Sequence, residues 1–384
     1  MKIYHMADLH LGKKLLGYPL ILEQEYILKQ QILPFIKKEK PDAVLISGDV
    51  FDTAVANIEA IALFDSFLEE LVQYCKKVFI ISGNHDSAQR LAFGQGLLSS
   101  ANVHISPVYN NNVKPITMQD NWGNINFYLL PFIKPPTVRP FFPEEKIENH
   151  ADALRIAIKA FNVNENERNI LLAHQFVTNA EKAGSEDMSV GGAENVPASV
   201  FKEFDYVALG HIHKPQTIKI NEEHTSILRY SGSPYCYSFS EANTQKQHTL
   251  INVNDKGSIE ITTSPIIPRN KLVNLKGTYQ ELMSKSYYDN LDLDDYYSIT
   301  LTDSEAIANV LQRMLTVYPN ILSFAYNNER TKTQATLEYS EKAENFMPLD
   351  WVKELYQKQN NVELSEEQLT WINPLIEKIW EDEK

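Results

Sequence analysis

Side chains able to bind metal ions recur directly after strand-like segments of this sequence. They are Asp8, His10, Asp49, Asn84, His85, His174, His211 and His213. Carboxylate, imidazole and amide groups together suit Mn, Fe or Zn better than Ca or Mg, which prefer shells of oxygen alone. In an extended segment, residues two apart point the same way, so each of the pairs Asp8/His10 and His211/His213 can face one cavity. The residue types and their spacing therefore predict a metal centre.

Asp49 is the natural centre of such a site. It follows the apolar run 43–46 and Gly48, and open α/β sheets place ligands at the carboxyl ends of buried strands. Taken alone, Asp49 is read first as a helix cap or a turn residue, but the other polar clusters favour a metal ligand. Seven ligands can build two metal sites if the Asp49 carboxylate bridges them. Two metals about 3.5–4 Å apart can clamp a phosphoryl group and supply a hydroxide at neutral pH.

The elements that must position these residues alternate between strands and helices. Strands are expected at 1–7, 43–47 and 78–82, with helices at 20–38 and 57–74 between them. This βαβαβ order predicts a largely parallel sheet with helices on its faces and a site along one edge. Later strands are expected at 103–106, 125–130 and 169–173, with a helix at 150–161, and a further apolar segment from Tyr206 leads to His211 and His213.

The second half of the chain suggests further domains. Pro265 and Pro268 bracket a boundary, so residues 1–268 are expected to form the first domain. Residues 269–330 are expected to form a small αβ domain, with strands at 271–275, 296–302 and 321–326 and helices at 278–285 and 304–317. A polar linker, 331–345, then leads to two acidic amphipathic helices within 346–384.

Composition bounds the class of protein. The 384 residues are 43% apolar and 22% charged, which is ordinary for globular proteins. No run approaches the roughly 18 apolar residues of a membrane span, so we expect a soluble, cytoplasmic protein without a membrane partner. The net charge is −14, but −6 of it falls in the last 44 residues, away from the candidate site. Total charge therefore excludes little about a nucleic-acid substrate, because bound cations would reverse the local sign.

Four motifs carry a family resemblance. Asp8-Leu9-His10, Gly48-Asp49-Val50-Phe51-Asp52, Gly83-Asn84-His85-Asp86 and Gly210-His211-Ile212-His213 occur in this order, each after a strand. The set resembles the calcineurin-like metallophosphoesterase superfamily. Ser231-Gly232-Ser233-Pro234 and Ser238-Phe239-Ser240-Glu241, with the domain after residue 268, are similar to the SbcD family of nuclease subunits. The resemblance implies an α/β fold, a β-sandwich flanked by helices, with a small αβ cap domain and C-terminal helices.

The resemblance also implies roles for single residues. Asp8, His10, Asp49 and His213 would hold one Mn²⁺ ion, and Asp49, Asn84, His174 and His211 a second. His85 matches the catalytic histidine of the family, which contacts the phosphate and protonates the leaving 3′ oxygen. Asp52 stands where some nuclease relatives carry a second histidine. We expect Asp52 either to touch the substrate or to orient His85 through a hydrogen bond.

The function implied is that of a Mn-dependent DNA nuclease of DNA repair, recombination and replication. It would act on double-strand ends and hairpins, as a 3′→5′ exonuclease and as an endonuclease, by attack of a hydroxide held by two metals. The cap domain would steer DNA, and an SbcC-type coiled-coil ATPase would bind the C-terminal helices. Lys13, Lys14 and Arg90 are candidates to contact DNA phosphates, although Arg90 is equally suited to pair with an acidic side chain.

Two further questions stay open at this point. The expected helix 57–74 has apolar residues on two faces and, with residues 90–98, predicts a homodimer contact. The alternatives to a nuclease are another metallophosphoesterase, such as a nucleotide phosphodiesterase or a phosphomonoesterase, and a non-catalytic scaffold. The cap and the C-terminal helices favour the nuclease over the first, and the complete ligand set with His85 argues against the second.

Overall fold

The computed structural model describes residues 1–182, 184, 195–220, 225–305 and 307–327. Seven later residues are also described: Lys353, Tyr356, Leu364, Ser365, Gln368, Leu369 and Ile372. The expected linker 331–345 lies outside the described residues, as do the expected C-terminal helices apart from these seven positions. In the described part of the chain, no helix has the length and apolar character needed to cross a membrane.

The chain forms two compact units. The first contains residues 1–275, 292–298 and 315–323, and the second contains 276–291, 299–314 and the described residues from 324 onward. The boundaries expected at 268/269 and 330/331 remain predictions. A three-stranded sheet has the order β15 (Leu272–Gly277), β16 (Tyr296–Leu301), β17 (Ile321–Tyr326).

The first unit is built on two six-stranded sheets. One has the order β14-β13-β1-β4-β5-β6, and its strands β1 (Lys2–Met6), β4 (Ala43–Ser47), β5 (Lys77–Ile81) and β6 (Val103–Ile105) run parallel. Strands β13 (Gln247–Val253) and β14 (Ile259–Pro265) complete it in antiparallel pairing. The helical connections between the parallel strands explain this arrangement, since a parallel pair needs a crossover.

The other sheet has the order β11-β12-β10-β9-β8-β7. Its central strands are parallel: β12 (Ile227–Tyr230), β10 (Tyr206–Gly210), β9 (Arg168–His174) and β8 (Gly123–Leu129). The edge strands β11 (Gln216–Lys219) and β7 (Ile116–Asp120) are antiparallel. A short hairpin, β2 (Lys14–Leu15) with β3 (Tyr18–Pro19), lies outside both sheets.

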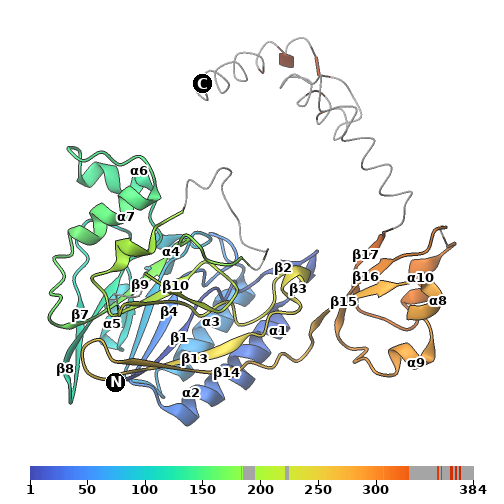
Figure 1. The fold of residues 1–384 in the computed structure, drawn as a ribbon, viewed down its shortest axis with the longest axis horizontal. Helices are drawn as coiled ribbons and strands as arrows, with labels where there is room; N and C mark the ends of the chain where they lie inside the picture. The colour runs from blue at the N-terminus through green and yellow to red at the C-terminus, as the bar shows by residue number, and fades with distance from the viewer. Residues whose placement is uncertain are drawn as a thin grey trace. The chain divides into compact units, whose positions relative to one another are not determined.

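The two sheets pack face to face and are covered by helices (Figure 1). Leu45 and Phe79 of the first sheet share one buried cluster with Phe127 and Leu172 of the second. The outer face of the first sheet packs on α1 (Ile21–Tyr26), a π-helix (Ile27–Ile32), α2 (Leu33–Glu39) and α3 (Ile58–Leu71). The outer face of the second packs on α6 (Pro135–Val138) and α7 (His150–Lys159). The predicted β-sandwich flanked by helices is therefore confirmed.

Shorter helices fill the connections. They are α4 (Ala88–Leu91), α5 (Gln95–Ser100), α8 (Tyr279–Leu282), α9 (Lys285–Tyr288), α10 (Val310–Met314) and 3₁₀ turns at Arg139–Phe141, Ala198–Phe201 and Phe239–Glu241.

Three predicted helices differ from the structure for local reasons. The helix expected at 20–38 contains the π-helical stretch just before Pro34, which cannot donate the α-helical hydrogen bond. The helix expected at 278–285 is divided by Ser284, whose backbone is extended. The helix expected at 304–317 begins only at Val310, because Asn309 has a left-handed backbone with φ of 54°.

The two sheets approach very closely where β10 ends. A Cβ atom placed on Gly210 would lie 2.0 Å from the carbonyl oxygen of Ser47, at the end of β4, and 2.7 Å from Nδ1 of His174. Neither neighbour is the end of a flexible side chain that can move away. Glycine is thus required at this position for the carboxyl ends of the strands to meet.

We expect Gly210→Ala to lower the free energy of unfolding by about 1–3 kcal/mol, the usual cost of overpacking. The matched control is Gly96→Ala in α5, because an added Cβ there meets nothing within 4 Å. This variant should raise the free energy of unfolding by about 0.5–1 kcal/mol. Urea unfolding measures both. Equal stability of Gly210→Ala and the unaltered chain would contradict the close approach.

Candidate metal centre

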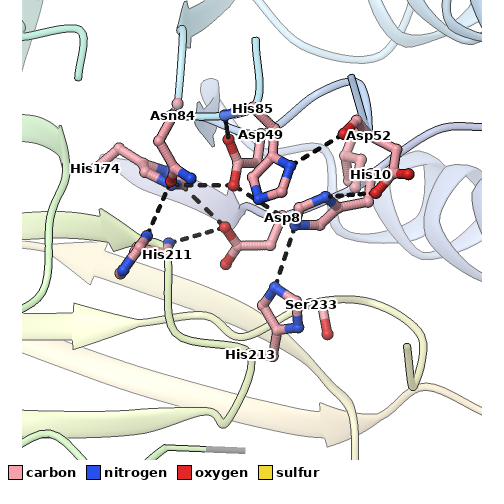
Figure 2. Close-up of polar contacts among 12 residues, drawn as sticks. Asp8, His10, Asp49, Asp52, Asn84, His85, His174, His211, His213 and Ser233 are labelled. Carbon is pink, nitrogen blue, oxygen red and sulfur yellow. Dashed lines mark hydrogen bonds and ion pairs between the residues drawn. The ribbon is translucent and has the colours of Figure 1, made fainter. Parts of the chain in front are cut away.

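The seven predicted metal ligands converge from five strand ends of both sheets (Figure 2). Asp8 and His10 follow β1, Asp49 follows β4, Asn84 follows β5, His174 ends β9, and His211 and His213 follow β10. All except Asn84 are buried, and Asn84 is partly buried. The structure thus brings together side chains that are up to 205 positions apart in the chain.

Four of these residues have an unusual backbone. Asp8, His10, Asp49 and His211 have φ values of 55°, 44°, 48° and 97°, which non-glycine residues adopt only at a cost. Main-chain hydrogen bonds hold the first three, since Asp8 N donates to Gly48 O at 3.0 Å and His10 N to Asp49 O at 2.9 Å. Strain of this kind concentrates at functional sites, where the surrounding structure fixes it.

The Asp49 carboxylate lies at the centre of the group. Its Oδ2 is 3.2 Å from His174 Nε2 and 3.5 Å from His10 Nε2, and its Oδ1 accepts a hydrogen bond from the His85 main-chain N–H at 2.9 Å. Burial alone would raise the pKa of Asp49, but the adjacent His174 holds that pKa well below its usual value. In turn, Asp49 overcomes the effect of burial on His174 and raises its pKa to about 9.

Imidazole nitrogens meet on both sides of this carboxylate. His10 Nε2 and His213 Nε2 are 3.2 Å apart, and His174 Nε2 and His211 Nδ1 each lie 3.0 Å from Asn84 Oδ1. Ligand atoms of Asp8, His10 and His213 lie within 4.8 Å of one another, as do those of Asp8, Asp49 and His174.

These donors fit divalent cations. Oδ2 of Asp8 is buried without a hydrogen-bond partner among the described residues, and burial raises the pKa of Asp8 to about 6. Burial lowers the pKa of His10 to about 4 and that of His211 to about 3, so both rings are neutral and can donate lone pairs. A buried carboxylate oxygen without a partner and converging neutral imidazoles are what metal ligation needs.

His85 lies next to this cluster and contacts Asp52 through the main chain. Its Nδ1 donates to the Asp52 carbonyl oxygen at 3.0 Å, and its ring packs edge-on against His10 with centroids 4.7 Å apart. The Asp52 carboxylate lies 2.7 Å from Lys13 Nζ and 3.3 Å from His10 Nδ1. Burial opposes ionisation of Asp52, yet the contacts with His10 and Lys13 lower its pKa to about 2. Orienting His85 was one of the two roles expected of Asp52. The Asp52 carboxylate faces His10 and Lys13, and its main-chain carbonyl accepts the hydrogen bond from His85.

The three predicted DNA contacts differ in their surroundings. Lys13 is engaged with Asp52, whereas Lys14, on the short hairpin, is exposed. Arg90 is exposed on α4, and its main-chain N–H donates to the Ser87 hydroxyl at 3.4 Å.

Sequence reasoning missed the residues that support the loops. Gln24, on α1, donates from Nε2 to His10 O at 2.7 Å and accepts from Gly12 N at 2.9 Å. Asp86 accepts from Gly83 N at 2.9 Å and from Phe51 N at 2.9 Å, so it ties the loops after β4 and β5 together. Two sequence features could have indicated these residues. Gln24 is a polar residue on the apolar face of a predicted helix, and Asp86 is the last residue of the Gly83–Asp86 motif.

Sequence comparisons with known proteins agree with this geometry. Residues 1–215 match the family model described as calcineurin-like phosphoesterase, and residues 268–360 match a model described as type 5 capsule protein repressor C-terminal domain. The curated D subunit of the nuclease SbcCD from Staphylococcus epidermidis is 32% identical over 329 residues, 85% of each chain. Among solved structures, the crystal structure of TT1561 of Thermus thermophilus is 12% identical, covers 69% of this chain and 99% of its own, and gives a TM-score of 0.42.

The first family model covers more than half of the chain, and the S. epidermidis relative matches most of it. The residues that bear the predicted site, up to His213, lie within the 1–215 match. The chain therefore belongs to the calcineurin-like phosphoesterase family and, within it, to the family of the SbcD nuclease subunits.

Proposed function

We propose that this metal-dependent phosphodiesterase is a DNA nuclease that holds two Mn²⁺ ions per chain and works with an SbcC-type ATPase. It acts on double-strand ends and hairpins, as a 3′→5′ exonuclease and as an endonuclease. The observation that carries the proposal is a pair of buried groups that share Asp8: ligand atoms of Asp8, His10 and His213 lie within 4.8 Å of one another, and so do those of Asp8, Asp49 and His174. The name of the S. epidermidis relative, a nuclease subunit of SbcCD, supports the substrate and the partner.

Each ion is assigned four ligands. Asp8, His10, Asp49 and His213 hold one, and Asp49, Asn84, His174 and His211 hold the other. The position of Asp49 between His10 and His174 supports its role as the shared ligand. When bound, two divalent cations would neutralise the phosphate and lower the pKa of a water placed for in-line attack.

His85 is proposed to move a proton at the leaving oxygen. Because its Nδ1 donates to the Asp52 carbonyl, Nε2 is the ring nitrogen that would exchange a proton with a phosphate ester. The main-chain N–H of His85 donates to Asp49 Oδ1. His85 would therefore hold the Asp49 carboxylate through its main chain and act as the general acid through its ring. Asp52 is proposed to act by holding Lys13 and His10 in place.

DNA is proposed to be held by phosphate contacts and by the later part of the chain. The exposed Lys14 and Arg90, with Lys13, would supply charge that is independent of sequence. Residues 269–330 are assigned as the cap that steers DNA to the site, and residues 346–384, after the linker 331–345, as the segment that binds the ATPase. The match of 268–360 to a single family model supports a separate C-terminal module.

Incubation of the purified chain with end-labelled linear duplex tests the activity. We expect mononucleotide release in Mn²⁺, no cleavage in excess chelator, and recovery when Mn²⁺ is restored, because the ions supply the charge that stabilises the transition state. Adding the ATPase partner should extend cleavage to hairpin ends. Full cleavage in excess chelator would contradict the proposal.

His85→Gln should lower kcat by about 10²–10⁴-fold, the usual contribution of a general acid, while two Mn²⁺ per chain are retained. The matched control is His104→Gln, because His104 lies on β6 beside Lys77 and should not alter turnover. Metal analysis and single-turnover cleavage measure the two effects. An unchanged rate for His85→Gln would remove this residue from the chemistry.

A homodimer is proposed through the exposed apolar surface formed by α3 and the segment 90–98. Phe93 and Leu97 are 86% and 83% exposed, and Ile58 and Ile61 on α3 are exposed as well. Between them lies an apolar hollow of about 590 Å³, lined in part by Phe64 and Leu91. Apolar surface gathered in this way is typical of an interface with another chain.

Leu97→Glu should convert a dimer into a monomer in sedimentation analysis at micromolar concentration, since a buried charge without a partner opposes association. Trp122→Glu is the control, because Trp122 is 56% exposed at the turn between β7 and β8, outside this surface. The proposal fails if the unaltered chain already sediments as a monomer at that concentration.

A further inference from the structure

A buried ion pair lies directly behind His213. Glu241, at the end of the 3₁₀ turn Phe239–Glu241, is fully buried, and Lys246, just before β13, is 5% exposed. Glu241 Oε2 is 2.5 Å from Lys246 Nζ. None of the four motifs that build the metal centre contains either residue.

The ammonium group of Lys246 has a partner for each of its three protons. It donates to Glu241 Oε2 at 2.5 Å, to Ser233 Oγ at 2.8 Å and to the main-chain carbonyl of His213 at 2.9 Å. An ammonium carries three donors and no acceptor, so its hydrogen-bonding capacity is filled. Lys246 therefore fixes both the Glu241 carboxylate and the backbone of His213.

The other carboxylate oxygen of Glu241 faces the His213 ring. His213 Nδ1 lies 3.3 Å from Glu241 Oε1, while its Nε2 lies 3.2 Å from His10 Nε2. An ionised carboxylate can only accept, so Nδ1 carries the proton and Nε2 presents its lone pair to the cluster. By contrast, the Nδ1 of His174 donates to a neutral carbonyl, that of Ser47, at 2.8 Å.

Stability alone does not account for this pair. Burying two opposite charges costs solvation that their attraction often fails to offset, and apolar residues of similar volume are frequently as stable or more so. A carboxylate that accepts from a metal-ligating histidine, however, fixes the tautomer and the ring orientation and raises the basicity of the ligand nitrogen. The contacts of Glu241 and Lys246 with His213 are those expected of a pair that orients a metal-ligating histidine.

We propose that Glu241, held by Lys246, is the positioning residue for His213 and sets the affinity of the ion bound by Asp8, His10 and His213. The inference deepens the proposed function and depends on its two-ion site. The ion on the side of Asn84, His174 and His211 does not depend on this pair, since the Nδ1 of His174 is held by Ser47.

The test is a calorimetric titration of the metal-free full chain with Mn²⁺ alone. In the double variant Glu241→Leu/Lys246→Met, the charges are replaced together, so the protein should fold, but the acceptor for His213 Nδ1 is lost. We expect the affinity of one site to fall about 10–100-fold, with the other site unchanged. Glu241→Gln keeps an acceptor oxygen and should lose less than the double variant.

Asp120→Asn is the matched control. The Asp120 carboxylate forms another ion pair, with the buried guanidinium of Arg168 at 2.5 Å. Loss of this ion pair should lower the melting temperature of the metal-free chain but leave both Mn²⁺ affinities unchanged. Unchanged affinities in the double variant, or an equal loss at both sites, would overturn the role of Glu241. An unaltered chain that binds no Mn²⁺ would overturn the proposed two-ion site itself, which is a separate result.

Discussion

The site is arranged around the carboxylate of Asp49. One histidine from each sheet, His10 and His174, lies within 3.5 Å of this carboxylate. His10 follows β1 of one sheet, and His174 ends β9 of the other. For both rings to reach the same carboxylate, the carboxyl ends of the two sheets must lie almost in contact. Gly48, just before Asp49, permits this locally, because a Cβ there would lie 2.4 Å from Nδ1 of His174 on the other sheet.

This arrangement concentrates backbone strain and buried charge in a small region. Three ligands on the loops after β1 and β4, Asp8, His10 and Asp49, have a left-handed backbone. The carboxylates of Asp8 and Asp49 are both buried, and their like charges interact. A hydrogen bond that Gln24 donates to His10 O, and those that the Asp86 carboxylate accepts from Gly83 N and Phe51 N, hold the loops in place. A site fixed in this way before ligand arrives needs little rearrangement when cations and a phosphate bind, which is the advantage of preorganised electrostatics in catalysis.

Much of the fold and the position of the site could be predicted from the sequence. The alternation of apolar runs with polar motifs predicted a largely parallel sheet with helices on its faces, and the family resemblance implied the sandwich of two sheets. The motifs around Asp8, Asp49, Asn84 and His211 contain side chains that the structure brings together. Their binding of metal stays a prediction. The contacts of Asp52 and the Glu241–Lys246 pair could not be predicted, because they depend on loops that meet only in the folded chain. The late start of α10 could not be predicted either, since apolar periodicity does not report the backbone of Asn309.

The most direct test of the account is anomalous diffraction at the manganese edge from crystals grown with Mn²⁺. We predict two anomalous peaks per chain on either side of the Asp49 carboxylate, one beside His10 and His213 and the other beside His174 and His211. A single peak, or peaks away from Asp49, would contradict the claim that this carboxylate joins two metal ions.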